Sequence, residues 1–165
     1  MGWGAMTETP HTARETLDKD HRVFERLADA LDRSRVRPPA EMRGLVSETR
    51  EVLEPALKAH ERLESALLAA LTLGNPGLAD GLRVAALQHD ALGSLVKDLR
   101  IILSEPGRYR ADHLASLTFL LARNLREHLR YEEEAFWSGL PAGWSGVPDG
   151  ACADLRRLES MLGRL

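Results

Sequence analysis

The sequence predicts an all-α protein, an up-down-up-down four-helix bundle with a short extra helix at its C-terminal end. Leu, Ala, Arg and Glu are abundant and only 5% of residues are aromatic, a mixture that favours helix over strand. Apolar residues recur every three or four positions along four long stretches, as on the buried face of a helix. Short segments rich in Gly and Pro separate these stretches, and short connections favour antiparallel neighbours.

Composition narrows the class of protein. The chain has 165 residues, of which 44% are hydrophobic, and this suits one domain with a substantial core. The net charge of -3 and the lack of a dense Lys/Arg run argue against nucleic acid as a partner. Cys152 is the only cysteine, so the chain cannot form an internal disulfide. No apolar run approaches a membrane span and no signal peptide is evident, so we expect a cytoplasmic protein that does not bind membranes and whose oligomeric state is open.

The first third of the chain is expected to hold a tail and one helix. Residues 1–12 contain Gly, Thr and Pro without apolar periodicity, which predicts a flexible tail. Residues 13–34 have apolar positions on one face and charged ones on the other, which predicts the first helix. The prolines within 35–39 end that helix, and Pro39 suits the start of the next.

The second helix is expected to run from Pro39 to about residue 73. It contains Pro55, which removes one backbone hydrogen bond at a cost of about 3 kcal/mol, so we predict a kink or a break within 51–55. The sequence Gly-Asn-Pro-Gly at 74–77 predicts a turn.

The third and fourth helices are predicted from the same signals, apolar periodicity and Gly- or Pro-containing connections. We expect a third helix over 78–104 and a fourth over 111–137, separated by Glu-Pro-Gly at 105–107. The bundle domain is thus predicted over 13–137. Residues 138–165 should form a surface loop rich in Gly, Pro and Ser, followed by a short fifth helix.

Each of the four long helices carries one histidine on its predicted apolar face. In two of them a glutamate follows the histidine by four residues, about one helical turn, so both side chains project from nearly the same face. Such a pair can bind one metal ion, or its carboxylate can bridge two. The histidines are His21, His60, His89 and His128, and the paired glutamates are Glu64 and Glu132.

Residue counts place these histidines at similar depths in the bundle. His60 and His89 each lie roughly 20 Å from the turn between them, at ~1.5 Å per residue, and His89 and His128 are similarly matched about the next turn. His21 and His60 match less well, because the second helix has several more residues before its histidine. Disruption at Pro55 or a longer loop is expected to absorb that excess.

A metal site explains this cluster better than ordinary burial does. One buried histidine taken alone is usually a hydrogen-bonded core residue. Four of them with two glutamates would leave many polar groups unsatisfied, at about 1 to 3 kcal/mol each against a total stability of about 5 to 15 kcal/mol. Imidazole and carboxylate without thiolate argue against iron–sulfur clusters and disfavour structural zinc, so iron or manganese fits best.

Two other metal-site patterns fit less well. The ferritin-like di-iron bundles use Glu-x-x-His pairs, a spacing absent from these candidate ligands. The sequence HERLE at 60–64 resembles the zinc-protease pattern HExxH, but Glu64 stands where that pattern has its second histidine.

The combined motifs resemble the hemerythrin-like family, the HHE cation-binding domain, over about residues 13–137. That resemblance implies a non-haem di-iron site, oxo- or hydroxo-bridged, in a four-helix bundle. The matching segments are DHRVFERL at 20–27, HERLE at 60–64, QHDAL at 88–92 and HLRYEEEAFW at 128–137.

The resemblance also implies roles for the candidate ligands. His21 and His60 would serve one iron, and His89 and His128 the other. Glu64 and Glu132 would bridge the two. Glu133 is the alternative second bridge, because oxygen-carrying hemerythrins use a shorter carboxylate five residues after the histidine.

The sequence departs from oxygen-carrying hemerythrins at Gly93. Those proteins have a further histidine four residues after the one in the third helix, so one iron here loses a ligand or takes water or a carboxylate. Glu61 is the available carboxylate, because the hemerythrin domain of an iron-sensing F-box protein resembles this chain in having His-Glu-x-x-Glu. The alternative for Glu61 is a solvated residue on the helix surface.

Three functions are consistent with such a site. We expect foremost a protein that binds or senses dioxygen, nitric oxide or peroxide. The alternatives are an enzyme that decomposes peroxide, and a protein that stores or delivers iron. Outside the cluster we expect His11 and His113 at the surface, and Tyr131 and Trp137 in packing roles, although a tyrosine beside iron can also carry redox chemistry.

Overall fold

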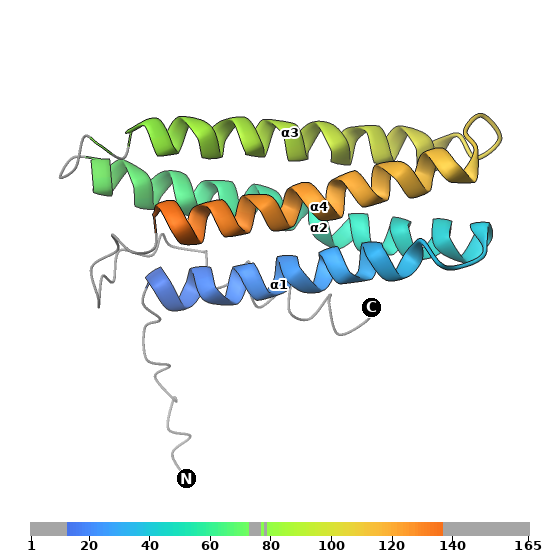
Figure 1. Cartoon of the computed structure of the whole chain (residues 1–165), viewed down its shortest axis with the longest axis horizontal. Helices are drawn as coiled ribbons and strands as arrows, with labels where there is room; N and C mark the ends of the chain where they lie inside the picture. The colour runs from blue at the N-terminus through green and yellow to red at the C-terminus, as the bar shows by residue number, and fades with distance from the viewer. Residues whose placement is uncertain (1–12, 73–76, 78, 137–165) are drawn as a thin grey trace, which may run out of the picture.

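The computed structural model describes residues 13–72, 77 and 79–136, and it consists of four long helices running side by side (Figure 1). No strand occurs within these ranges. Each helix packs against its neighbours in the chain, and the first also packs against the fourth. The predicted all-α four-helix bundle is confirmed. The helices are α1 (Ala13–Ser34), α2 (Pro39–Thr72), α3 (Ala79–Ser104) and α4 (Ala111–Ala135).

The expected tail, C-terminal loop and short fifth helix fall on 1–12 and 137–165, outside the described residues. The four helices begin and end within two residues of the predicted bounds. Proline at the start of α2 and the Gly- and Pro-containing connections explain this agreement, because both act through local backbone geometry.

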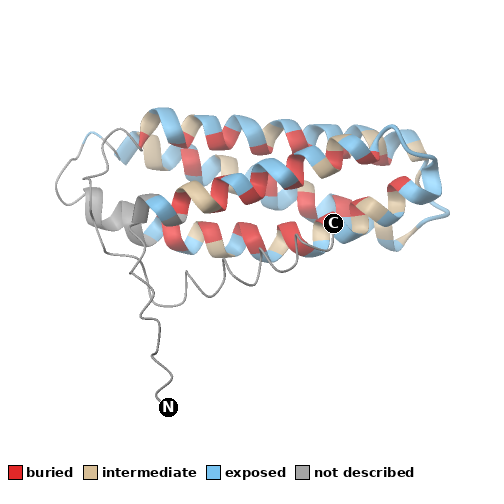
Figure 2. Cartoon of the chain, turned by 90° about the horizontal axis from the view of Figure 1, so that it is seen from below, coloured by how far each residue is buried: buried red, intermediate tan, exposed pale blue. Residues whose placement is uncertain are grey.

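The core is formed by the apolar face of each helix. Buried positions recur along every helix and alternate with exposed ones, as the colours of Figure 2 show. Phe24, Leu53, Leu99 and Leu125, one from each helix, are completely or almost completely buried. Burying a side chain of this size contributes about 1.5 to 3 kcal/mol. This packing holds the polar cluster described below in a rigid frame.

The helix α2 runs through Pro55 without the predicted break. Pro55 is exposed, while Leu53, Ala56 and Leu57 beside it are buried in the core. The backbone carbonyl left without its hydrogen bond therefore lies on the side of the helix that water can reach, and packing on the opposite side keeps the helix continuous. Whether α2 bends there stays a prediction.

The mismatch in depth between His21 and His60 is absorbed by the connection between α1 and α2. Figure 1 shows that α2 begins beyond the C-terminal end of α1, so residues 35–38 run on along the bundle axis. The extra residues of α2 extend past α1, and the rings of His21 and His60 lie with their centroids 5.6 Å apart.

The outward faces of the helices carry charged pairs at one-turn spacing. Arg123 and Glu127 lie 2.8 Å apart, and Arg50 and Glu54 lie 3.0 Å apart. Exposed pairs of this kind contribute at most about 1 kcal/mol each. They keep the surface polar, and none of the described helices is long and apolar enough to cross a membrane.

Candidate metal centre

Four imidazole rings, one from each helix, converge on the carboxylate of Glu132. The Nε2 atoms of His21 and His128 each lie 3.0 Å from one of its oxygens. The Nε2 atom of His60 lies 3.3 Å from both oxygens, and that of His89 lies 3.7 Å from one. Glu132 is only 1% exposed. One buried carboxylate thus contacts histidines from all four helices, with His21 on one oxygen and His128 on the other.

Glu64 lies beside this convergence on the side of α3. One of its carboxylate oxygens is 3.1 Å from Nε2 of His89, and the same nitrogen is 3.0 Å from Nε2 of His128. The other oxygen of Glu64 is buried and has no hydrogen-bond partner. A buried carboxylate oxygen without a partner is costly unless something binds to it.

Two further side chains hold the outer nitrogens of the rings. Nδ1 of His60 lies 2.8 Å from Oδ2 of the buried Asp20 and donates a hydrogen bond to it. Nδ1 of His128 lies 3.1 Å from the amide oxygen of Gln88. These contacts orient both rings so that Nε2 points into the cluster, as outer partners do for histidines that bind metals.

The charges of His60 and Glu132 are coupled. Burial by itself lowers the pKa of His60, but the charge of Glu132 and hydrogen bonds to Asp20 and Glu132 raise it well above its ordinary value. Burial by itself raises the pKa of Glu132, whereas the charge of His60 and hydrogen bonds from three histidines lower it well below its ordinary value. Without metal, an imidazolium and a carboxylate therefore face each other at the centre of the bundle.

Glu64 and His89 are held in their neutral forms. Burial, and then the negative charge of Glu132, raise the pKa of Glu64 to about 8. Burial, and then the charges of His128 and His60, lower the pKa of His89 to about 3. Perturbations in opposite directions within one cluster are typical of functional sites.

The donor set fits a metal ion. His60, His89, His128 and Glu132 each offer one ligand atom, and these four atoms all lie within 4.8 Å of one another. His21 and Glu64 adjoin this group through the contacts given above. Imidazole nitrogens and carboxylate oxygens suit iron or manganese, and a cation would neutralise the crowded carboxylates.

Glu132 and Glu133, which the sequence left as alternatives, have different surroundings in the structure. Glu132 lies inside the cluster, whereas the side chain of Glu133 is 49% exposed and contacts only the outer nitrogen of His21, at 3.3 Å. One residue turns a helix by about 100°, which is why adjacent glutamates face in different directions. Glu61 is half-buried beside His89, outside the four-residue group.

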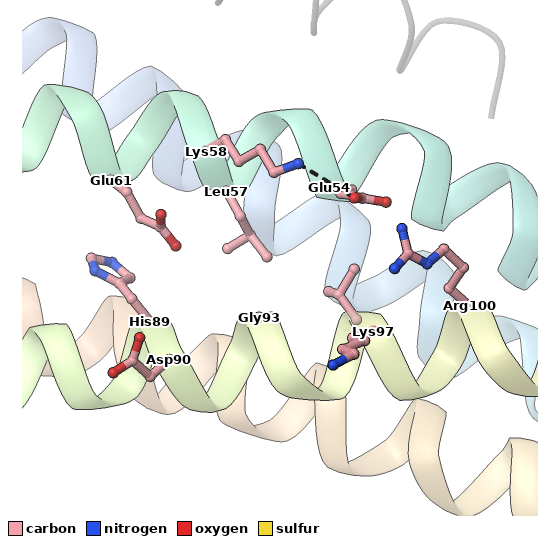
Figure 3. Close-up of a pocket in the computed structure, with 10 residues that line it drawn as sticks. Glu54, Leu57, Lys58, Glu61, His89, Asp90, Gly93, Lys97 and Arg100 are labelled. Carbon is pink, nitrogen blue, oxygen red and sulfur yellow. Dashed lines mark hydrogen bonds and ion pairs between the residues drawn. The ribbon is translucent and has the colours of Figure 1, made fainter.

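A pocket of about 380 Å³ lies beside the cluster, between α2 and α3. Figure 3 shows His89 and Glu61 at one end of it and Gly93 on its wall. A side-chain carbon built onto Gly93 would meet no atom within 4 Å. The position that carries a histidine in oxygen-carrying hemerythrins is thus open space in this protein.

Sequence reasoning missed Asp20 and Gln88. Both stand directly before a histidine, and both also fall on the apolar stripe of their helix, since Asp20 is three residues after Leu17 and four before Phe24. A carboxylate on a core stripe is the signal that identifies such a residue, because a buried charge needs a partner.

The remaining polar and aromatic candidates lie away from the centre. His113 is exposed, as expected. Tyr131 donates a hydrogen bond to the backbone oxygen of Gly81 at 3.2 Å and packs against Phe136, which confirms its packing role. His11 and Trp137 lie outside the described residues.

Comparison with known proteins identifies the family. Residues 12–137 match the model of the Hemerythrin HHE cation binding domain. A search of the curated proteins and a search of the solved structures each found no match. The matched range spans all four helices and every residue of the cluster, and the chain belongs to the hemerythrin HHE cation-binding domain family.

Proposed function

We propose that the cluster binds two iron ions, and that the protein uses this centre to bind or sense dioxygen, nitric oxide or peroxide in the cytoplasm. The observation that carries the proposal is the convergence of four imidazole Nε2 atoms on one buried carboxylate. Membership of a cation-binding family supports it. Manganese is the alternative metal, because it accepts the same ligands.

The proposed ligand roles follow the contacts on either side of Glu132. His21 and His60 bind one iron, and His89 and His128 bind the other. Glu132 bridges the two, since its two oxygens contact histidines of both pairs. Glu64 is the second bridge, because its unpaired oxygen lies in the same buried space. Glu61 supplies the further carboxylate beside His89.

The protein's own groups prepare the site for the metal. Asp20 and Gln88 hold the outer nitrogens of His60 and His128, so that these rings keep their Nε2 atoms directed inward. Phe24 packs against the ring of His60, with the two centroids 5.1 Å apart, and limits the access of water on that side of the cluster. Iron supplies reversible one-electron chemistry and coordination positions for a small ligand.

The first test is metal content. We expect protein reconstituted anaerobically with ferrous iron to hold two iron ions per chain, because the nitrogens of four imidazoles and both oxygens of two bridging carboxylates are more donor atoms than the roughly six positions around one ion. Elemental analysis with a protein assay measures the ratio. One zinc per chain with no uptake of iron would contradict the assignment.

Iron affinity should depend on pH. Glu64 keeps its proton below about pH 8 in the metal-free protein, and the raised pKa of His60 keeps a proton on that ring. Both groups must lose a proton to bind metal, so iron uptake releases protons. Apparent affinity is therefore expected to rise with pH up to about pH 8, by roughly tenfold per pH unit for each proton released, and the contribution of Glu64 should level off above that pH.

Competition with a chelator under anaerobic conditions measures this dependence, after correction for the chelator's own protonation. An affinity that stays constant or falls over the same range would show that neither group must lose a proton when iron binds.

The open space at Gly93 favours a second candidate function, the decomposition of peroxide. An iron with fewer protein ligands has more positions for an exogenous molecule. Anaerobic reconstitution followed by optical spectra with dioxygen, nitric oxide and peroxide, each added separately, distinguishes the two. Sustained turnover of peroxide supports the enzyme, and a spectral change that ends at one equivalent supports binding or sensing.

A further inference from the structure

We propose that the pocket between α2 and α3 binds an organic carboxylate, with its anionic group at Lys97 and Arg100 and its uncharged end beside His89. This inference rests on the proposed function, since it places an organic molecule beside the iron assigned to His89, next to the small ligand that the iron itself would bind. The structure supports it through the size of the pocket, the arrangement of its charges and the absence of a side chain at Gly93.

The pocket is larger than a diatomic ligand requires. Its volume is about 380 Å³. One water molecule occupies roughly 30 Å³ of liquid, whereas sites for small organic ligands hold about 300 to 1,000 Å³. A passage for dioxygen alone needs only a small part of this space.

The charges of the pocket are separated along its length. Figure 3 shows Glu61 and Asp90 near His89, with Lys97 and Arg100 toward the other end. Lys97 follows His89 by eight residues on the same helix, which separates the two by about 12 Å along the axis. A bound molecule with one negative group is therefore oriented, with that group away from the acidic end.

Two cations at the far end are available to such a ligand. Glu54, which also lines this end, is already paired with Arg50 at 3.0 Å and with Lys58 at 3.4 Å. In the part of the chain that the structure describes, no carboxylate forms an ion pair with Lys97 or Arg100. A ligand carboxylate supplies the missing negative charge.

The middle of the pocket suits an uncharged chain. Leu57 and Val96 line it and are themselves almost fully buried, so they form its apolar floor. Gly93 leaves the wall beside them open, because no atom lies within 4 Å of the position of an added Cβ. A medium-length aliphatic carboxylate such as octanoate therefore matches the pocket from its cations to the neighbourhood of His89.

Calorimetric titration of the iron-loaded protein with octanoate tests this. We expect binding at millimolar concentration or tighter, and a change in the optical spectrum of the iron centre. Lys97→Glu and Arg100→Glu should each weaken binding about tenfold or more, because each replaces an attraction with a repulsion. Gly93→Leu should weaken it at least as much by filling the pocket, without harm to folding, since leucine favours a helix more than glycine does.

Arg83→Glu is the matched control, because it makes the same charge change on an exposed part of the same helix outside the pocket. It should bind octanoate as the wild type does. If the wild-type protein takes up iron and azide but does not bind octanoate, the proposed pocket site is wrong and the iron site is unaffected. Equal weakening of octanoate binding in all variants leads to the same conclusion. The protein could also fail to take up iron and still bind octanoate, with binding lost in Lys97→Glu and kept in Arg83→Glu. That result would support the pocket site and contradict the proposed iron function.

Discussion

Replacing Glu132 with alanine is expected to remove most of the bound iron. Among the described residues, its carboxylate is the one group in contact with histidines of all four helices, and it is almost fully buried. The carboxylate of Glu64 contacts His89 on the side of α3, so it does not replace Glu132 at the centre. The loss should exceed the roughly 10- to 100-fold weakening that removal of an outer partner causes. Elemental analysis after anaerobic reconstitution, followed by desalting, measures the effect.

Glu133→Ala is the matched control for this experiment. It deletes the same side chain from the next residue, whose carboxylate is half exposed and contacts only the outer nitrogen of His21. Its iron content should stay close to that of the wild type. Greater loss from Glu133→Ala than from Glu132→Ala would identify Glu133 as the bridge instead.

The histidines permit the same comparison. His60→Ala and His128→Ala should each lose most of the iron, because both rings direct Nε2 into the cluster and are almost fully buried. His113→Ala should lose none, since His113 is exposed on the same helix as His128. Equal iron content in all three variants would refute the ligand assignment.

The reduced protein is expected to oxidise rapidly in air and not to carry dioxygen reversibly. The iron assigned to His89 and His128 lacks the further histidine of oxygen carriers, and the space at Gly93 joins a pocket open to solvent. Stable oxygen carriage needs a single vacant coordination position on the iron, in a site that is shielded from water. Nitric oxide and azide should bind readily at the same iron. Optical spectra recorded after anaerobic reduction and mixing with air measure the rate.

Gly93→His should slow this oxidation by about tenfold, which is the lower end of what a change in a metal's surroundings typically produces. Position 93 lies one helical turn after His89, so the new ring faces the same side, and the structure has room for it. Gly93→Ala is the control. It adds a side chain but no ligand, and it should oxidise at the wild-type rate.

A lasting and reversible uptake of dioxygen by the wild-type protein would contradict this prediction. Dioxygen released under vacuum after hours, with the original spectrum of the reduced protein restored, would show that the site is shielded despite Gly93. Equal rates for Gly93→His and Gly93→Ala would show that the missing ligand does not control the reaction.

The helix bounds and the pairing of candidate ligands on one helix face are local features, and the sequence was sufficient to predict them. Helix bounds follow from proline, glycine and apolar periodicity, all of which act within a few residues. The pairing of His60 with Glu64 and of His128 with Glu132 on one face follows from helix geometry alone. The burial predicted for these four side chains is confirmed.

Contacts between helices were decided only by the tertiary structure. The rotation and axial shift of each helix bring Asp20 of α1 to His60 of α2, and they turn Glu132 rather than Glu133 toward the centre. Packing on the far side of α2 also carries the helix through Pro55, where local backbone chemistry alone predicts a break or a kink. Periodicity states which face of a helix is buried, but it does not state which atom of a neighbouring helix that face meets. The partners of each histidine depend on how four separate helices pack together.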